Sequence, residues 1–466
     1  MRFLALCLGG SFGLLLCVLA PSKVVVALAG LALLVTIMNR PHWGLLLFAF
    51  FATSIPFTTV TLGVRTSLSE AMLMLTWVSI MWQKFLNRDS VNFNFRSGPE
   101  SVLLTLMLFS VFPFVIGQIV IDAQAGGGIV NWVRWLMDLS VFFMVPVLLK
   151  DDARREQLIV ALLLGTLCML VISIGSFLID RNAMKMYHIL EKLQYGNMAA
   201  VRDIFSGNFT RMGSPWVHPN LTGGVLALFI PLALFYGWTR RGWRRLLGLS
   251  VTILGCAGIM FSISRGAILA LTIMLIWLTY KNVPYSGRIL GLGAILAVLL
   301  VATYPPLQDR LSTVFSSTNA STQIRFDEYH MFPEAVIKYP FGIGFKIDPP
   351  APGLLGISNL WLNFWYKIGL VGMLLFILVT VRWWKLVRPR TGKLPITYNN
   401  ALWLGSFTGL SAALLTGLFD HYYSFTYVLI ALFWLLMGIN IQQVRLHPDM
   451  PTGQKTIPDK PPLPSP

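Results

Sequence analysis

The chain has 466 residues, of which 56% are hydrophobic and only 12% charged, and its mean hydropathy is +0.69. A soluble domain carries about 25% charged residues, so the composition excludes an ordinary soluble protein. The apolar residues form continuous Leu-rich blocks without strand-like alternation, which favours membrane-spanning helices over a β-barrel. We interpret the net charge of +17 as loop anchors at a membrane surface and not as a nucleic-acid-binding face.

Fourteen apolar blocks can be drawn along the chain. They run over residues 3–20, 24–38, 43–62, 68–82, 101–121, 130–149, 157–179, 219–238, 246–263, 267–280, 289–304, 357–381, 398–418 and 424–441. Several are shorter than the roughly 20 residues that a spanning helix needs. The sequence therefore predicts an all-α, polytopic membrane helix bundle of about 12–14 transmembrane helices. The first block lacks a good cleavage site and is expected to be a retained helix.

The distribution of Lys and Arg residues predicts the orientation of the chain. If the N-terminus is cytoplasmic, most cations fall on the cytoplasmic segments, namely Arg2, Arg40, Lys84, Arg88, Arg96, Lys150, Arg154, Arg155, Arg240, Arg241, Arg244, Arg245, Lys281, Arg288, Arg382, Lys385, Arg388, Arg390, Lys393, Arg445, Lys455 and Lys460. The short loops on the other side hold only Lys23, Arg65 and Arg265. This asymmetry predicts that both termini are cytoplasmic.

Loop lengths divide the chain into four regions. We expect N-terminal transmembrane helices over 1–179, a central region over 180–381, C-terminal transmembrane helices over 382–441 and a disordered, Pro-rich cytoplasmic tail over 442–466. The central region contains two long outer segments, 180–218 and 305–356. The second is expected to be partly helical, with an amphipathic helix from Gln323 to Tyr339. Outer loops of this length usually carry function.

The first candidate site feature is the tripeptide Ser264-Arg265-Gly266, in the turn between two apolar blocks. An outward-facing Arg265 runs against the charge asymmetry, and a turn this short does not need an arginine. One interpretation is a side chain that reaches out to lipid headgroups. The other is a phosphate-binding arginine, whose planar guanidinium can donate two hydrogen bonds at once.

Two further features lie on the long outer segments. Arg211 precedes His218 and Asn220, and Asn220 is expected to cap the helix that follows it, where backbone N–H groups favour an anion. His218 would then lie at the membrane rim, as a structural hydrogen-bond donor or as a base.

The second outer segment adds the charged residues Arg325, Asp327, Glu328 and His330 near the start of its amphipathic stretch. A surface helix with ordinary charge pairs is the alternative interpretation there. His421 follows Asp420 at the outer end of a membrane block, where ionisable groups are costly and are therefore candidate site residues. The sequence has no zinc-ligand spacing, no P-loop and no serine-nucleophile elbow, so we expect neither a metal site nor a cofactor.

These segments together resemble the superfamily of O-antigen ligases and Wzy-type polysaccharide polymerases of bacterial inner membranes. The matching stretches are RMGSPWVHPNLTGGVLAL (211–228), SRGAILAL (264–271), RFDEYHMFPEAVIKYPFGIGF (325–345) and NLWLNFWYKIGLVG (359–372). The resemblance covers roughly residues 205–380, so the central region is interpreted as ligase- or polymerase-like.

The resemblance implies a glycosyltransferase that works without a metal at the periplasmic face. Its donor would be an oligosaccharide linked to undecaprenyl diphosphate, and its other partners would be membrane lipids, a chain-length regulator and export machinery. It implies that Arg211, Arg265 and Arg325 hold the diphosphate, with His218 and Asn220 beside them. Fixed arginines can stabilise the charge that develops on such a leaving group.

One departure from the family pattern leaves the general base open. Ligases usually have a His-Asn pair at the end of the long loop, where this chain has Ser358-Asn359. The candidates for the base are then His330, Glu328, Asp327 and His421. The departure favours a polymerase of exopolysaccharide or O-antigen repeat units over an O-antigen ligase that acts on lipid A core.

Two classes without this chemistry remain as alternatives. A transporter or flippase would share the many helices, but its charges would lie nearer the middle of the membrane and its helices would be broken by Gly or Pro. A non-catalytic scaffold for polysaccharide export would leave the Ser264-Arg265-Gly266 and His218-Pro219-Asn220 motifs unexplained.

Overall fold

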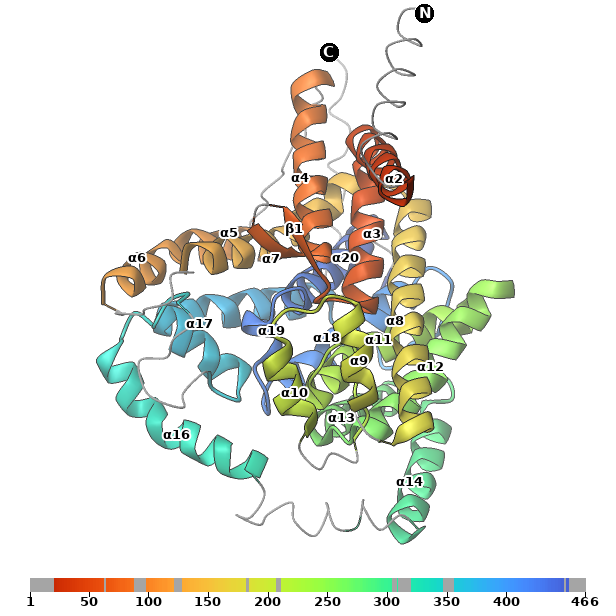
Figure 1. The fold of residues 1–466 in the computed structure, drawn as a ribbon. Helices are drawn as coiled ribbons and strands as arrows, with labels where there is room; N and C mark the ends of the chain where they lie inside the picture. The colour runs from red at the N-terminus through yellow and green to blue at the C-terminus, as the bar shows by residue number, and fades with distance from the viewer. Residues whose placement is uncertain are drawn as a thin grey trace, which may run out of the picture.

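The computed structural model describes residues 21–62, 64–87, 98–120, 128–181, 184–206, 211–303, 308, 320–346, 356–447 and 450–451. The expected helix over 3–20 and most of the expected disordered tail lie outside these residues. The described part is a helical bundle with one small hairpin (Figure 1). This confirms the predicted all-α membrane fold.

The long helices follow the apolar blocks in chain order. They are α2 (Pro21–Asn39), α3 (Pro41–Ser54), α4 (Leu68–Asn87), α5 (Pro99–Phe109), α6 (Val111–Val120), α7 (Gly128–Leu148), α8 (Asp152–Asp180), α11 (Pro219–Thr239), α12 (Gly242–Ser262), α13 (Arg265–Tyr280), α14 (Ser286–Thr303), α17 (Leu360–Val387), α18 (Ala401–Thr416) and α20 (Leu429–Leu446). In the described residues, 8 helical stretches are long and apolar enough to cross a membrane, with α5 and α6 forming one of them. Shorter apolar stretches occur in α2, α13 and α18.

Residues 43–62 are not one membrane helix, as the sequence had suggested. Helix α3 ends at Ser54, and strands β1 (Thr59–Leu62) and β2 (Val64–Ser67) form an antiparallel pair. The β-branched residues that fill both strands favour an extended backbone. Ser67 and Glu70 then begin α4 with reciprocal capping bonds, because the Ser67 N–H donates to Glu70 Oε2 and the Glu70 N–H donates to Ser67 Oγ.

The long outer segments contain short helices that lie against the bundle. Helices α9 (Met184–Lys192) and α10 (Met198–Ser206) occupy the first segment, where the sequence predicted only a loop. Helix α16 (Ala320–Lys338) occupies the second and confirms a helix in this stretch, but its apolar residues are spread around it and not gathered on one face. It runs along the outside of the bundle beside α17 (Figure 1). At the other terminus, α20 continues to Leu446, so the boundary predicted at 442 lies inside a helix.

Burial distinguishes central helices from peripheral ones of similar hydropathy. The apolar window of α11 is 89% buried inside the protein and that of α20 is 83% buried, whereas α14 is only 6% buried. A helix that is apolar all round must face either a protein core or lipid. Helices α11 and α20, together with α18, therefore form the centre of the bundle, and α14 lies at its edge.

The segments that the charge pattern assigned to opposite sides of a membrane gather at opposite ends of the bundle. At one end, which we call the site end, the Leu360 N–H donates to the Gly417 carbonyl at 2.6 Å and the Met212 N–H donates to the Phe261 carbonyl at 3.1 Å. At the opposite end, the Arg445 side chain pairs with Glu100. These contacts join segments that the charge pattern assigned to the same side; the orientation itself stays a prediction.

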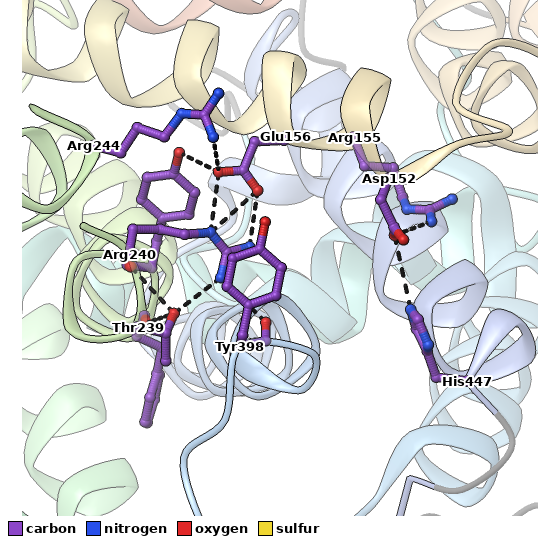
Figure 2. Close-up of polar contacts among 10 residues, drawn as sticks. Asp152, Arg155, Glu156, Thr239, Arg240, Arg244, Tyr398 and His447 are labelled. Atoms are coloured by element: carbon purple, nitrogen blue, oxygen red, sulfur yellow. Dashed lines mark hydrogen bonds and ion pairs between the residues drawn. The ribbon is translucent and has the colours of Figure 1, made fainter. Parts of the chain in front are cut away.

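A buried ion pair joins helices at the opposite end of the bundle (Figure 2). Arg240, at the end of α11, donates from Nε and Nη2 to the Glu156 carboxylate of α8 at 3.0 and 2.8 Å. Its guanidinium carbon lies 3.5 Å from the ring centroid of Tyr398, and the Tyr236 hydroxyl donates to Glu156 Oε1 at 2.8 Å. Figure 2 also shows Asp152 between Arg155 and His447 of the C-terminal segment. These contacts join α8, α11 and the segments flanking α18 and α20.

Replacing Arg240 with Ala is expected to destabilise the protein strongly, because Glu156 would be left buried without its main partner. Breaking a buried pair from one side typically costs about 3–5 kcal/mol. The measurement is the melting temperature of the detergent-purified protein. Arg241→Ala is the matched control, since Arg241 is the exposed neighbour. Equal melting temperatures for the two variants would contradict this assignment.

Candidate functional site

Three helices begin at the site end within a small region. Helix α11 begins at Pro219, α13 at Arg265 and α17 at Leu360. Helix N-termini carry partial positive charge and unsatisfied N–H groups, so their convergence favours an anion. The His218 and Asn359 side chains cap α11 and α17, whereas the Ser264 side chain makes no capping bond to α13.

The Ser264-Arg265-Gly266 turn is formed by close packing against α11. Ile263, which precedes it, has a left-handed backbone with φ of 48°. A Cβ at Gly223 of α11 would lie 2.3 Å from Ser264 Cβ, so only glycine lets the turn approach this closely. On its other side, Gly266 lies against the Phe419 side chain, 3.5 Å from an added Cβ. The turn is thus held between α11 and the segment after α18.

Arg211 ties the turn to the start of α11. The side chain is only 5% exposed, and its Nε donates to the Ser262 carbonyl at 2.6 Å. Its Nη2 donates to the Asn220 side-chain oxygen and to the Ile263 carbonyl. These bonds give Arg211 a positioning role in addition to its charge. Asn220, predicted to bind substrate, contacts Arg211.

The cap of α11 is His218, not Asn220 as predicted. Pro219 occupies the first helical position, where its missing N–H costs nothing, so the helix begins two residues earlier than expected. His218 Nδ1 accepts a hydrogen bond from the Asn220 N–H at 3.2 Å. Burial lowers the pKa of His218, and the charge of Arg211 lowers it further, against the opposing effect of Asp420. The imidazole is therefore neutral near pH 7, with Nδ1 as acceptor and Nε2 as donor.

Asp420 links Arg325 and His421, which are far apart in the sequence. An Arg325 Nη lies 4.0 Å from one Asp420 oxygen, and His421 Nδ1 lies 3.6 Å from the other. Burial raises the pKa of Tyr422, and the Asp420 carboxylate raises it further, so the phenol stays protonated and hydrogen-bonds to Asp420. Neither Arg325 Nε nor His421 Nδ1, both buried, has a hydrogen-bond partner among the described residues.

One face of α16 holds the end of the long outer loop. Glu328 is buried and its Oε2 accepts a hydrogen bond from the Ser358 N–H at 2.7 Å, while the Tyr329 hydroxyl donates to the Ser358 carbonyl at 3.2 Å. Asp327 and His330 lie on α16 but are exposed. The structure therefore brings together Arg325, Glu328 and His421 of the sequence-predicted charged residues, and leaves Asp327 and His330 outside the cluster.

A buried polar network fixes His421 relative to the loop end. The Asn363 amide donates to Ser424 Oγ at 2.7 Å, and its side-chain oxygen accepts the Ile357 N–H at 3.2 Å. Ser424 Oγ in turn donates to the His421 carbonyl. His421 Nε2 lies 3.3 Å from the position of an added Cβ on Gly356. The imidazole thus lies beside the last residues of the loop.

Helix α7 holds none of the motif residues but contacts the same region. The Trp135 indole N–H donates to the Ser424 carbonyl at 3.0 Å, and Asp138 accepts the Val428 N–H at 3.3 Å at the start of α20. The Asn131 amide donates to the Phe345 carbonyl at 3.1 Å. These three residues follow helical spacing on one face, so α7 anchors both the segment after α18 and the end of the α16 segment.

The Gly342-Ile343-Gly344 turn is wedged against a kink in α17. Ile343 and Gly344 donate their N–H groups to the carbonyls of Tyr366 and Lys367 at 3.0 and 2.9 Å. Gly342 has φ of 86°, and a Cβ there would lie 2.5 Å from the Lys367 carbonyl oxygen. The kink itself includes Gly369, with φ of 76°. These glycines let two backbones touch, which sets where α16 meets the bundle.

The arrangement is suited to an anionic ligand next to a candidate base. Arg211 and Arg325 lie near enough to His218 to act on its charge together with Asp420, and Arg325 lies near Glu328 and Asp420 in the same way. Arg265 begins α13 two residues after Ile263, whose carbonyl accepts a hydrogen bond from Arg211. Asp420 Oδ1 accepts the His421 backbone N–H at 2.9 Å and lies 3.6 Å from His421 Nδ1, so its carboxylate is held beside the imidazole without a hydrogen bond to the ring. The described residues contain no group of three or more His, Cys, Asp and Glu side chains placed to hold a metal ion.

The sequence predicts most of the charged cluster but not the residues that position it. Asp420 was noticed only as the neighbour of His421, and Asn363, Ser424 and Trp135 were not identified. Asn363 follows the cap Asn359 by four residues, which is a weak signal for one helix face. Ser424 and Trp135 give no local signal, because their partners are distant in sequence.

Comparison with known proteins gives one result for the central region. Residues 250–377 match the family model described as O-antigen ligase. No curated protein matches the chain. The matched range includes Arg265, Arg325 and Glu328, whereas Arg211, His218 and His421 lie outside it. This match confirms the family resemblance carried by the motifs.

Proposed function

We propose that the chain, whose residues 250–377 match the O-antigen ligase family model, polymerises repeat units of an exopolysaccharide or O-antigen. The donor would be a glycan on undecaprenyl diphosphate, and the acceptor a sugar hydroxyl at the periplasmic face of a bacterial inner membrane. The coarser conclusion, a multi-pass membrane enzyme of the glycan-transfer type, rests on the family match together with the apolar helices.

The observation that carries the proposal is the pair of buried nitrogens beside Asp420. Arg325 Nε and His421 Nδ1 lack hydrogen-bond partners among the described residues. A buried donor without a partner typically costs about 1–3 kcal/mol. Such atoms also occur elsewhere in the described chain, as at Arg155 Nε and Trp434 Nε1, so what supports a ligand site here is their place beside Asp420 at the end where three helices begin. A diphosphate oxygen would supply the partner for Arg325.

Arg265 and Arg325 are assigned to the diphosphate, with the start of α13 contributing backbone N–H groups. Arg211 holds the turn that presents Arg265, through its bonds to the Ser262 and Ile263 carbonyls. His218, neutral and with Nε2 as donor, adds a hydrogen bond to a phosphate or sugar oxygen. Fixed donors of this kind stabilise the negative charge that grows on the leaving group.

His421 is assigned as the general base. The acceptor hydroxyl oxygen forms a bond to the anomeric carbon of the donor, the bond from that carbon to the phosphate oxygen breaks, and the diphosphate leaves on its lipid. The hydroxyl proton passes to His421 Nε2. Asp420, 3.6 Å from Nδ1, orients the ring and stabilises the imidazolium. Glu328 instead serves the loop end through its bond to the Ser358 N–H.

The acceptor is the point on which two candidate functions differ. Ser358-Asn359 replaces the His-Asn pair of ligases, and this favours polymerisation. The description of the matched family favours a ligase that transfers glycan to lipid A core, and His421 beside Gly356 could serve as base in either reaction. A chain-length regulator and export machinery are the protein partners that a polymerase would need.

Replacing Arg265 with Lys is expected to impair the enzyme nearly as much as replacing it with Ala. Lysine keeps the charge but loses the two-pronged donor geometry. A hydrogen bond to a charged group contributes about 1.5–3 kcal/mol, which corresponds to a loss of roughly ten- to a hundredfold in carrier affinity or rate. The measurement is polymer formation from purified lipid-linked repeat units in detergent. A wild-type yield of polymer from a folded Arg265→Lys protein would rule out two-pronged binding of the diphosphate by Arg265.

Replacing His421 with Ala should lower kcat by about 10²–10⁴-fold, the usual loss for a general base, with little change in carrier binding. His330→Ala is the matched control, because His330 belongs to the same motif set but is exposed on α16. The readouts are single-turnover transfer rate and binding of a fluorescent carrier analogue. If His421→Ala kept the wild-type transfer rate and His330→Ala were slow, the general base would be His330 and not His421.

A further inference from the structure

A groove lies away from the charged cluster, between α3, α8 and α9. It is open to the surface and has a volume of about 570 Å³. Its walls include Phe50 of α3, Ile172 and Gly175 of α8, and Ile189 of α9. All of its α8 residues come from the half of that helix nearer the site end, from Cys168 onward. An occupant would therefore lie in the membrane leaflet at that end.

The groove wall is apolar apart from one cation. The two serines in the wall turn their hydroxyls back into their own helices, Ser54 to the Phe50 carbonyl and Ser176 to the Ser173 carbonyl. Lys185, on α9, is the one charged residue in the wall. Among the described residues no carboxylate pairs with it, and the nearby Glu191 pairs with His188 instead.

The groove is separated from the charged cluster by protein. The Tyr195 hydroxyl, which follows α9, donates to the Pro215 carbonyl at 2.9 Å, and Val217 packs on the same apolar cluster as Tyr195. These contacts lie between α9 and the cap His218. A molecule in the groove would therefore be distinct from the donor bound at Arg265, yet it would contact the helix that supports the start of α11.

We propose that the groove binds one acyl chain of an anionic phospholipid, with Lys185 paired to its phosphate. A pocket of this volume is in the range of small-ligand sites, which are mostly apolar with a few placed polar groups. One lysine matches the single charge of a phosphodiester, whereas a diphosphate would be expected to need several cations. A lysine near an anionic lipid surface contributes about fivefold in affinity.

The test uses the full-length protein in phosphatidylcholine nanodiscs that contain a trace of phosphatidylglycerol with a photoactivatable acyl chain. Labelling of the peptide spanning 165–195 is expected. Gly175→Phe should reduce it at least tenfold, since a Cβ at Gly175 meets nothing within 4 Å and the ring would fill the groove. Gly293→Phe on lipid-facing α14, where the space is equally open, is the matched control and should leave labelling unchanged.

Lys185→Ala should lower labelling by phosphatidylglycerol about fivefold and leave labelling by a phosphatidylcholine probe unchanged. Val171→Trp blocks the groove from another wall position and replaces Gly175→Phe if that variant fails to fold. Equal labelling of wild type and a folded, blocked variant would overturn the site. Equal labelling of the wild type by both probes would overturn the assignment to an anionic lipid. The same conclusion would follow if undecaprenyl phosphate displaced the bound phosphatidylglycerol probe and excess unlabelled phosphatidylglycerol did not.

Discussion

Arg211 is buried at the membrane rim, and the geometry of the charged cluster depends on how its guanidinium is satisfied. An arginine cannot lose its charge in a protein, so burial requires that its N–H groups find acceptors. Here the acceptors are the Ser262 and Ile263 carbonyls and the Asn220 side chain, which belong to two different helix ends. Satisfying one charge therefore fixes the relative position of α11, α12 and α13. The turn that carries Arg265 follows directly from Ile263, so its placement is set by the same bonds.

The two ends of the bundle use their ionic residues differently. At the opposite end, Glu156 and Arg240 are matched by two-pronged hydrogen bonds and by aromatic rings (Figure 2). At the site end, Arg325 Nε and His421 Nδ1 remain without hydrogen-bond partners in the described chain, around one carboxylate. Buried ionic atoms without partners also occur at the opposite end, at Arg155 Nε and Glu100 Oε2, so a missing partner alone does not mark a ligand site. The charges at the site end differ in lying where α11, α13 and α17 begin.

The sequence predicts the helices well because each membrane span is a local property of about 20 residues. It fails after Ser54, where α3 ends and strands 59–62 and 64–67 form a hairpin. It also fails at α9 and α10, whose amphipathic pattern is too short to stand out. The same limit applies to the site. Arg265, Arg325 and His421 could be named from charges at membrane ends, because such charges are rare there. Their supports could not, since Asn363, Ser424 and Trp135 act through contacts with distant segments.

The activity proposed for this cluster is transfer of a glycan from a diphosphate carrier to a growing chain. The most direct measurement is the profile of carrier-linked glycans in cells that lack the gene, with the wild-type gene restored as control. If the protein polymerises repeat units, single repeat units accumulate on the carrier and long chains disappear. Accumulation of long carrier-linked chains would contradict polymerisation and assign the reaction to a ligase. An unchanged profile would contradict glycan transfer by this protein.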